Sequence, residues 1–477
     1  MLKRQGVLAT VVLFVILAVS SPYLSAQEFS ERKQVAVFRL SYYGEPRDPV
    51  PQSQTYIRIG NIFAYSRTVE SETTEIFQQA VGAIDEQIRS VFINMGRFDV
   101  IGLTQRMQES NVDAFVNALR SYREDTLEIP EAVLVGEQAF TEQDFERLVG
   151  GFVLVIPSVS FYNLQRRDRE QDYQATIETS FTFVNVEDFS TIGQFFVETS
   201  GTDDNAVTAM RRAVNGIPGQ LEFRVRSMPI FQIRTGVLEI AGRSVIMEFG
   251  QNMGLQRGDE YAVVQRRVTS TGHTTQDETG LLVVEEVREE FSIGRLLYAN
   301  PNIVIGDQLQ EVPRMGADIT PYANVLLNIS TQDLEVLLFG ARITASRGFF
   351  AWRPLVGIEI PTTTTLFGFL FPMNVYVGGE RNFYLGRLKM HPSFGVGVGG
   401  AVPVDDSLFE DDFYTTHVGG SLRLTASYLV SRDTMVFLET GVAGWHGFYD
   451  RNWSNSTVNR FFASYGGILV GGGVTFK

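Results

Sequence analysis

Residues 387–399 read RLKMHPSFGVGVG, a stretch in which apolar side chains return at every second position. One face would carry Leu388, Met390, Phe394, Val396 and Val398. The other face would carry charged and polar residues followed by glycines. Because successive side chains of a β-strand point to opposite faces, this period of two predicts a strand with one apolar and one polar face.

The same alternation recurs through the last third of the chain and predicts eight successive strands between residues 318 and 477, with no helix among them. An antiparallel barrel in an outer membrane has this pattern, because it shows one face of each strand to lipid and the other to its interior. Strands of roughly ten residues or more suit a tilted crossing of the hydrocarbon layer. A soluble barrel or sandwich with its apolar face inward is the alternative. The other seven predicted strands lie within residues 319–329, 337–344, 352–360, 367–377, 421–428, 436–442 and 468–476.

The connections between these strands fit an outer-membrane barrel, which has short periplasmic turns and longer external loops. We expect tight turns near Gly348, over 379–382 and over 431–434. Longer loops are expected over 402–416 and 450–459. With both termini on the periplasmic side, the domains before residue 315 would lie in the periplasm.

The end of the chain carries Val474 and the aromatic Phe476. It resembles the membrane-insertion signal that the barrel-assembly machinery recognises in outer-membrane proteins. Lys477 departs from that pattern, because the aromatic residue is penultimate instead of last. In size, the barrel over 315–477 resembles those of the OmpA and OmpW families, which implies an eight-stranded outer-membrane fold.

The N-terminal segment has the features of a secretory signal peptide. Lys3 and Arg4 precede an apolar run over 7–19, and small residues follow up to Ala26, which predicts a signal peptide over 1–26. A retained helical anchor needs about twenty apolar residues, and this run is shorter. The chain has no cysteine, which excludes lipid attachment through an N-terminal cysteine, disulfides and cysteine-based metal sites.

The formal net charge is −15, and nearly all the excess acid lies between the signal peptide and the barrel. Nucleic acid is therefore not an expected partner, because affinity for it rests on basic surface. The four histidines have no metal-ligand spacing, and the glycine-rich stretch over 395–400 lacks the Lys and Ser or Thr of a phosphate-binding loop. We therefore expect no enzyme activity, no cofactor and no metal site.

The region between signal peptide and barrel is predicted to form an α/β domain over 27–228 and a small all-β domain over 229–314. In the second domain, short strands alternate with turns, and the pairs Gly258-Asp259 and Gly306-Asp307 suit tight reversals. In the first domain, residue patterns predict strands over 34–40, 98–101, 151–161 and 173–186, a helix from about Thr74 to a stop at Gly96, a helix capped by Thr104 and a helix from about Asn205.

The order of elements in the α/β domain, with the segment Gly96-Arg97-Phe98-Asp99-Val100-Ile101, resembles the CsgG-type curli secretion lipoproteins, the TolB N-terminal domain and a module of the flagellar protein FlgT. The all-β domain, with Gly258-Asp259 and Ile305-Gly306-Asp307 each before a strand, resembles the five-stranded barrel that ends FlgT-type proteins. These resemblances imply a role in envelope, secretion or motility-apparatus assembly. The chain departs from the CsgG type in lacking a lipidated cysteine and an obvious pair of pore-forming hairpins.

Charged residues on the inward face of the predicted barrel form the candidate site. An eight-stranded barrel is just wide enough for side chains to fill it, so these charges must pair. An ion-pair plug is one interpretation, and a water-filled, anion-preferring path is the other, because bases outnumber acids. The acidic run over 410–412 is a further candidate, either for a cation or as solvated surface. The predicted lumen cluster comprises Arg342, Arg353, Glu359, Arg387, Lys389, Arg423 and Glu439.

Together these features predict a non-enzymatic outer-membrane protein whose barrel anchors periplasmic domains that bind a protein partner. Expected partners are outer-membrane lipid, the barrel-assembly machinery during insertion and a periplasmic protein, with oligomers left open. The alternative is a transport protein, either a narrow pore through the barrel or an oligomeric secretion channel. A hydrolase or binding protease is a more distant alternative, because the sequence has no catalytic set.

Overall fold

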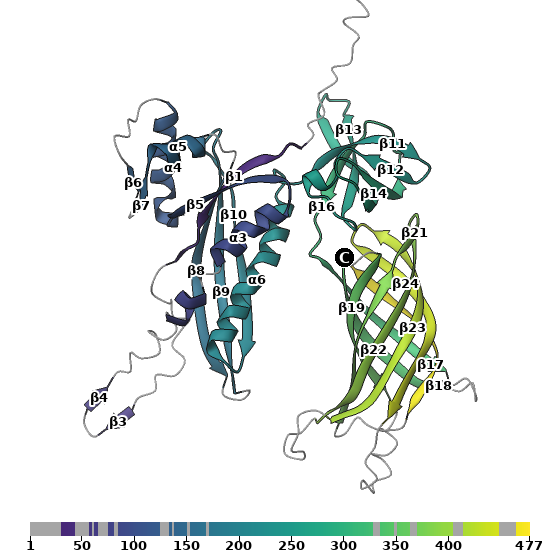
Figure 1. The fold of residues 1–477 in the computed structure, drawn as a ribbon. Helices are drawn as coiled ribbons and strands as arrows, with labels where there is room; N and C mark the ends of the chain where they lie inside the picture. The colour runs from purple at the N-terminus through teal and green to yellow at the C-terminus, as the bar shows by residue number, and fades with distance from the viewer. Residues whose placement is uncertain are drawn as a thin grey trace, which may run out of the picture.

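Three folded units follow one another along the chain in the computed structural model (Figure 1). They are an α/β domain, a closed six-stranded barrel, here the small barrel, and a closed eight-stranded barrel, here the large barrel. The structure describes residues 30–42, 57–59, 62–64, 75–80, 84–124, 133–135, 138–149, 153–167, 171–327, 334–347, 351–362, 370–403, 414–447 and 464–477.

The α/β domain is built on a mixed sheet with the strand order β10-β9-β8-β1-β5, in which β2 also pairs with β8. Strand β1 is parallel to both β5 and β8, whereas β8, β9 and β10 are antiparallel. The strands are β1 (Lys33–Arg39), β2 (Ser41–Tyr42), β5 (Phe98–Arg106), β8 (Val153–Arg167), β9 (Asp172–Asn185) and β10 (Thr191–Asp203). Two short hairpins lie outside this sheet, β3 (Ile57–Ile59) with β4 (Ile62–Ala64) and β6 (Val133–Val135) with β7 (Gln138–Phe140).

Helices cover both faces of this sheet. Alternation along β1 sends Val35 and Val37 into a core shared with α3 (Ile84–Asn94) and α6 (Ala206–Ser227). Ala36 and Phe38 enter the opposite core, shared with α4 (Val112–Arg123) and α5 (Glu142–Val149). Residues 75–80 are also helical, and η1 (Glu109–Asn111) precedes α4. In the part of the chain that the structure describes, no helix is both long and apolar enough to cross a membrane.

The predicted helix boundaries in this domain are partly right. Gly96 ends its helix with a φ of 71°, and the side chain of Asn205 caps α6 by accepting a hydrogen bond from the Thr208 amide. The helix cap at Thr104 is wrong, because pairing with β1 extends β5 as far as Arg106. Strand β10 was not predicted, although it completes the antiparallel side of the sheet.

The small barrel has six strands, so the predicted count of five is wrong. It closes because β16 pairs with both β11 and β13. The two predicted Gly-Asp reversals are confirmed, with φ values of 93° at Gly258 and 88° at Gly306. Its elements are β11 (Arg234–Ala241), β12 (Ser244–Met247), η2 (Gln251–Met253), β13 (Glu260–Val268), β14 (Thr274–Val287), β15 (Ser292–Ala299) and β16 (Gln308–Val312).

The large barrel confirms the prediction of eight antiparallel strands. It closes through pairing of its first strand with its last, where Thr320 and Thr475 contact each other at 3.0 Å. The C-terminus lies at the end of this barrel next to the small barrel (Figure 1). The barrel strands are β17 (Ala317–Leu327), β18 (Leu334–Ala345), β19 (Trp352–Thr362), β20 (Leu370–Arg381), β22 (Leu388–Pro403), β23 (Tyr414–Ser431), β24 (Thr434–Gly447) and β25 (Tyr465–Phe476).

The turns near the small barrel are short, but one is not where the sequence predicted it. The turn expected over 379–382 is wrong, because β20 continues to Arg381 and an extra strand, β21 (Phe383–Leu385), follows. The reversal comes at Gly386, which has a φ of 74°. The turn after Ser431 is confirmed. Gly348, the predicted strand start at 367–369, the acidic run at 410–412, the loop at 450–459 and the signal peptide at 1–26 lie outside the described residues.

Candidate functional site

The outer surface of the large barrel is a belt of exposed apolar side chains. The exposed fraction reaches 74% for Leu438 and 62% for Leu422, values that would be costly in water. A belt of this kind is what a barrel presents to hydrocarbon. The belt includes Ile319, Phe339, Ile343, Val356, Ile358, Val377, Phe394, Val396, Val398, Val418, Leu424, Val436, Val442, Ile468 and Val470.

The inside of the large barrel carries a buried ion-pair network centred on Glu439. One carboxylate oxygen of Glu439 accepts from Arg342 at 2.9 Å, and the other accepts from Arg423 at 3.2 Å. Asn324 and Thr425 donate to the same carboxylate at 2.8 and 3.2 Å. All five side chains are buried, and the Glu439 carboxylate accepts from two cations and two neutral donors.

A second carboxylate, Glu359, extends this network across the barrel. Arg423 forms an ion pair with Glu359, and Tyr322 donates a hydrogen bond to it at 2.9 Å. Tyr322 also contacts the hydroxyl of Tyr376 at 2.8 Å. The guanidinium of Arg423 lies over both tyrosine rings, at 5.2 and 5.4 Å from their centres. Rings and charges from four strands, β17, β19, β20 and β23, therefore meet in the lumen at this level.

The end of the lumen next to the small barrel holds a separate charged layer. Arg353 donates to Asp318 at 2.5 Å and to Glu380 at 3.2 Å. The ring of His391 lies 3.3 Å from Glu380 and contacts Ser427 at 2.9 Å. Paired charges therefore lie at two levels along the axis of the lumen.

The structure places most of the predicted lumen residues inside the barrel. Arg342, Glu359, Arg423 and Glu439 form the central network, and Arg353 and Lys389 lie in the layer next to the small barrel. Arg387 lies elsewhere, at the rim, where its guanidinium covers the ring of Tyr298 in the small barrel at 4.1 Å. The predicted insertion residues lie on the closing strand, with Val474 half-buried and Phe476 51% exposed. The predicted lumen cluster did not include Tyr322, Tyr376, Asp318 or Glu380, which the structure places beside it.

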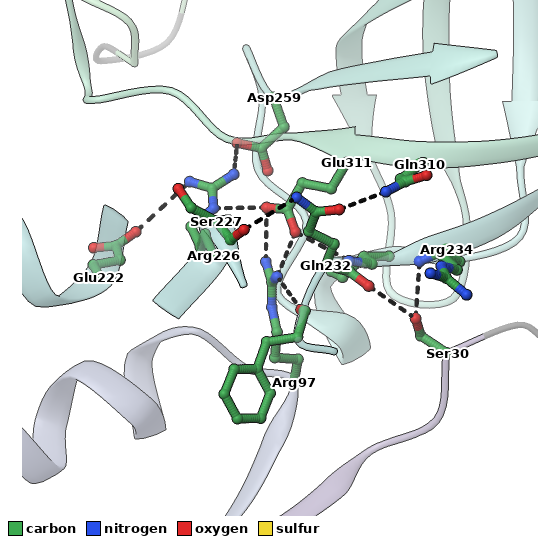
Figure 2. A network of polar contacts seen from close by, with 12 residues as sticks. Ser30, Arg97, Glu222, Arg226, Ser227, Gln232, Arg234, Asp259, Gln310 and Glu311 are labelled. Atoms are coloured by element: carbon green, nitrogen blue, oxygen red, sulfur yellow. Dashed lines mark hydrogen bonds and ion pairs between the residues drawn. The ribbon is translucent and has the colours of Figure 1, made fainter. Parts of the chain in front are cut away.

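A second charged network joins the α/β domain to the small barrel, and its centre is Glu311 (Figure 2). Arg97, next to Gly96, donates to both oxygens of Glu311, at 2.5 and 3.1 Å. Arg226 in α6 donates to it at 2.6 Å, and the backbone amide of Ile233 donates at 3.1 Å. Arg97 and Arg226 of the α/β domain thus both bind one carboxylate of the small barrel. We call Arg97, Arg226 and Glu311 the joint.

Asp259 of the small barrel connects the joint to the large barrel. It accepts from Arg226 at 3.1 Å and from Arg347, in the turn after β18, at 2.8 Å. Arg347 also pairs with Glu222 of α6 at 3.3 Å. All three folded units therefore meet through one small cluster of alternating charges.

Further ion pairs fasten the small barrel to the rim of the large barrel. Glu260 pairs with Arg314 at 2.5 Å and with the side chain of Lys477. Glu278 pairs with Arg432 at 2.9 Å in the turn before β24. Burial raises the pKa of Glu260, but the cations Lys477 and Arg314 outweigh it and leave the pKa lowered. Glu260 therefore stays ionised in this contact.

The pKa of Glu311 makes the joint sensitive to acid. Burial alone would raise this pKa, but Arg97 and Arg226 outweigh it and lower the pKa to about 2, from 4.5 for a free glutamate. A lowered pKa stabilises the folded state above pH 4.5, and that stabilisation is lost as the pH falls toward 2. We expect the free energy of unfolding to fall over this window less steeply in Glu311→Gln than in the unchanged protein, as measured by denaturant unfolding. Equal slopes would contradict this assignment.

Two glycines bring the α/β domain and the small barrel into backbone contact. Gly254 has a φ of 76°, and a Cβ there would lie 1.7 Å from the carbonyl oxygen of Met95. Gly96 lies on the other side of the same contact, with 2.7 Å between its Cβ position and the Cα of Gly254. Only a residue without a side chain allows the two backbones to approach this closely.

We expect Gly254→Ala to loosen the joint. Its matched control is Gly242→Ala, because Gly242 has a similar φ of 64° but nothing within 4 Å of its Cβ position. Both variants carry a left-handed backbone penalty of about 1–2 kcal/mol, and Gly254→Ala adds an overlap of about 1–3 kcal/mol. Denaturant unfolding of both variants measures the difference. Equal destabilisation would show that the two domains do not touch at Gly254.

The described part of the chain offers no arrangement that would support metal chemistry. It contains no group of three or more His, Asp or Glu side chains placed to hold a metal ion. Of the three histidines in the large barrel region, His391 is taken up by Glu380 and Ser427, and His446 contacts Ser464 at 3.1 Å. The lumen network can occupy the interior of the large barrel. The joint can hold the α/β domain against the small barrel.

Comparisons with known proteins give no family for the chain. No protein-family model and no curated protein matches it. Among solved structures, Neisserial surface protein A has a TM-score of 0.24 at 11% identity, with 34% of this chain and 97% of that one covered. A Xanthomonas campestris protein has a TM-score of 0.22 at 9% identity, covering 42% and 87%. OmpT, an outer membrane protein of Vibrio cholerae, has a TM-score of 0.16 at 8% identity, covering 68% and 95%. At these scores the likenesses support no conclusion about fold or function.

Proposed function

We propose that the protein is a non-enzymatic outer-membrane protein whose large barrel anchors two periplasmic domains, and that these domains bind a protein partner in envelope, secretion or motility-apparatus assembly. The observation that carries the proposal is the combination of an apolar outer belt with a lumen filled by paired charges. The belt supports residence in a membrane. The filled lumen supports anchoring in preference to conduction.

The balance of charge in the lumen disfavours the alternative of an anion-preferring pore through the barrel. That alternative rested on a surplus of bases, which would favour a path for anions. The described lumen instead has four bases and four acids, because Asp318 and Glu380 add to the acids and Arg387 lies outside. Each of the four acids is held by an arginine.

A rigid joint supports a role for the soluble domains as a platform. The backbone contact at Gly254 and the buried pairs at Glu311 hold the α/β domain and the small barrel in one orientation relative to each other. The small barrel exposes an apolar patch suited to a protein partner, made by Leu238 beside Val304 and Ile305, with exposed fractions of 50%, 55% and 66%. The amide of Gly306 donates to the carbonyl of Val237, which fixes these residues side by side.

Site-specific photo-crosslinking in cells tests the proposal. A photoreactive residue at Ile305 should give a discrete adduct with one envelope protein, while the same residue at the exposed Ser270, in the β13–β14 hairpin, should give none. Protease added to intact cells should cut only loops at the far end of the barrel. Absence of any adduct across the exposed positions of both soluble domains, or cleavage within those domains in intact cells, would refute the proposal.

A further inference from the structure

A cavity of about 80 Å³ lies between the small barrel and the rim of the large barrel. Gly258, Val283 and Val284 form its small-barrel side. The opposite side comes from the strand ends of the large barrel and includes Trp352 and Tyr384. The charged residues that line it are Arg257, Glu260, Glu285, Arg314, Asp318, Arg353, Lys389 and Lys477.

The three carboxylates around this cavity are already occupied. Glu260 pairs with Arg314 and Lys477, and Asp318 pairs with Arg353. Glu285 pairs at 3.0 Å with Arg295, which lies outside the cavity lining. None of the three is therefore left to neutralise a further cation.

Lys389 is a lining cation that takes part in none of these pairs. It is only 5% exposed, yet within the described ranges its ammonium group makes no hydrogen bond or ion pair. Glu380, the acid that acts on it most strongly, is bound by Arg353 and lies against His391. A buried ammonium without a hydrogen-bonding partner is unfavourable, so the site calls for an acceptor that carries negative charge.

We propose that this cavity binds a single phosphate group, with Lys389 as its main ligand. The volume of about 80 Å³ is large enough for one tetrahedral oxyanion. Further donors on the walls are the hydroxyls of Ser346 and Tyr384 and the guanidinium of Arg257. Because Lys389 belongs to the large barrel and Arg257 to the small barrel, a bound phosphate would link the two units. The inference is independent of whether the soluble domains bind a partner protein.

Calorimetric titration of the full-length protein in phosphate-free detergent with inorganic phosphate tests the site. We expect saturable binding, weakened about ten-fold or more in Lys389→Gln, because one charge-assisted hydrogen bond is lost. Arg381→Gln is the matched control, since Arg381 is an exposed cation at the same rim, outside the cavity, over the ring of Phe383. It should bind phosphate as the unchanged protein does.

A second titration distinguishes the source of the phosphate group. Short-chain phosphatidylglycerol should compete with inorganic phosphate if a lipid headgroup reaches the cavity, and it should leave binding unchanged if the cavity admits only the free ion. Both results support the site, provided that Lys389→Gln weakens the binding. Near-ultraviolet circular dichroism confirms that each variant is folded. Absence of saturable binding, or equal binding by the folded Lys389→Gln and Arg381→Gln variants, would overturn the inference.

Discussion

Replacing Glu439 with alanine is expected to destabilise the large barrel by about 3–5 kcal/mol, the penalty for leaving a buried charge without its partner. Arg342 is 3% exposed, and Glu439 is its only ion-pair partner among the described residues. Arg423 would keep Glu359 but lose its second pair. Asn324 would lose its acceptor as well. Urea unfolding of the barrel in lipid vesicles measures the change.

The control for this variant is Thr440→Ala, the next residue of β24, whose side chain is exposed on the outer face. It should change stability by less than 1 kcal/mol or so, as typical exposed substitutions do. The double variant Glu439→Ala with Arg342→Met removes both members of one pair, and its loss should be smaller than the sum of the two single losses. Additive losses would mean that Arg342 and Glu439 do not interact as the structure shows.

Replacing Glu311 with alanine is expected to cost the joint about 3–5 kcal/mol, because Arg97 and Arg226 are both buried against this carboxylate. Arg226 retains Asp259, whereas Arg97 retains, among the described residues, only the carbonyl of Phe231. The two domains should therefore separate more readily while the large barrel stays folded. No comparable effect is expected on the lumen networks, which share no residue with the joint.

Hydrogen exchange at the Ser30 amide reports the opening, since this amide of the α/β domain donates to the carbonyl of Arg234 in the small barrel and does not bind Glu311. We expect faster exchange there in Glu311→Ala and easier proteolysis over 228–233. Glu239→Gln removes an exposed acid of the same small barrel and should leave both rates unchanged. Unchanged exchange in Glu311→Ala would mean that the joint does not hold the domains together.

The large barrel could be predicted from the sequence because its signal is local. An apolar residue at every second position determines both the strand and its two faces, and membrane strands repeat this signal around the whole barrel. The same alternation brought Arg342 and Glu439 to one interior, although they are far apart in the chain. The alternation gave a wrong prediction for Arg387. Its place in the alternating pattern is that of an inward-facing residue, but it lies at the rim, where its guanidinium covers the ring of Tyr298 in the small barrel.

The joint could not be predicted, because it has no local pattern. Arg97 and Glu311 are 214 residues apart, and nothing in the spacing of either residue indicates that they meet. Glycine offered the one usable signal: Gly96 was correctly predicted to end a helix, but its contact with Gly254 depends on the packing of two domains. The helix cap predicted at Thr104 is wrong for a related reason. Pairing with β1 extends strand β5 past Thr104 and overrides the local residue pattern that favoured a helix there.

The central claim is that the large barrel is a closed anchor, and single-channel recording tests it most directly. The full-length protein is inserted into planar bilayers, and insertion is verified by protease protection of the barrel. We predict no steady conductance, because paired charges at two levels and the rings of Tyr322 and Tyr376 fill the lumen. A steady, ohmic conductance from the inserted protein would contradict the account.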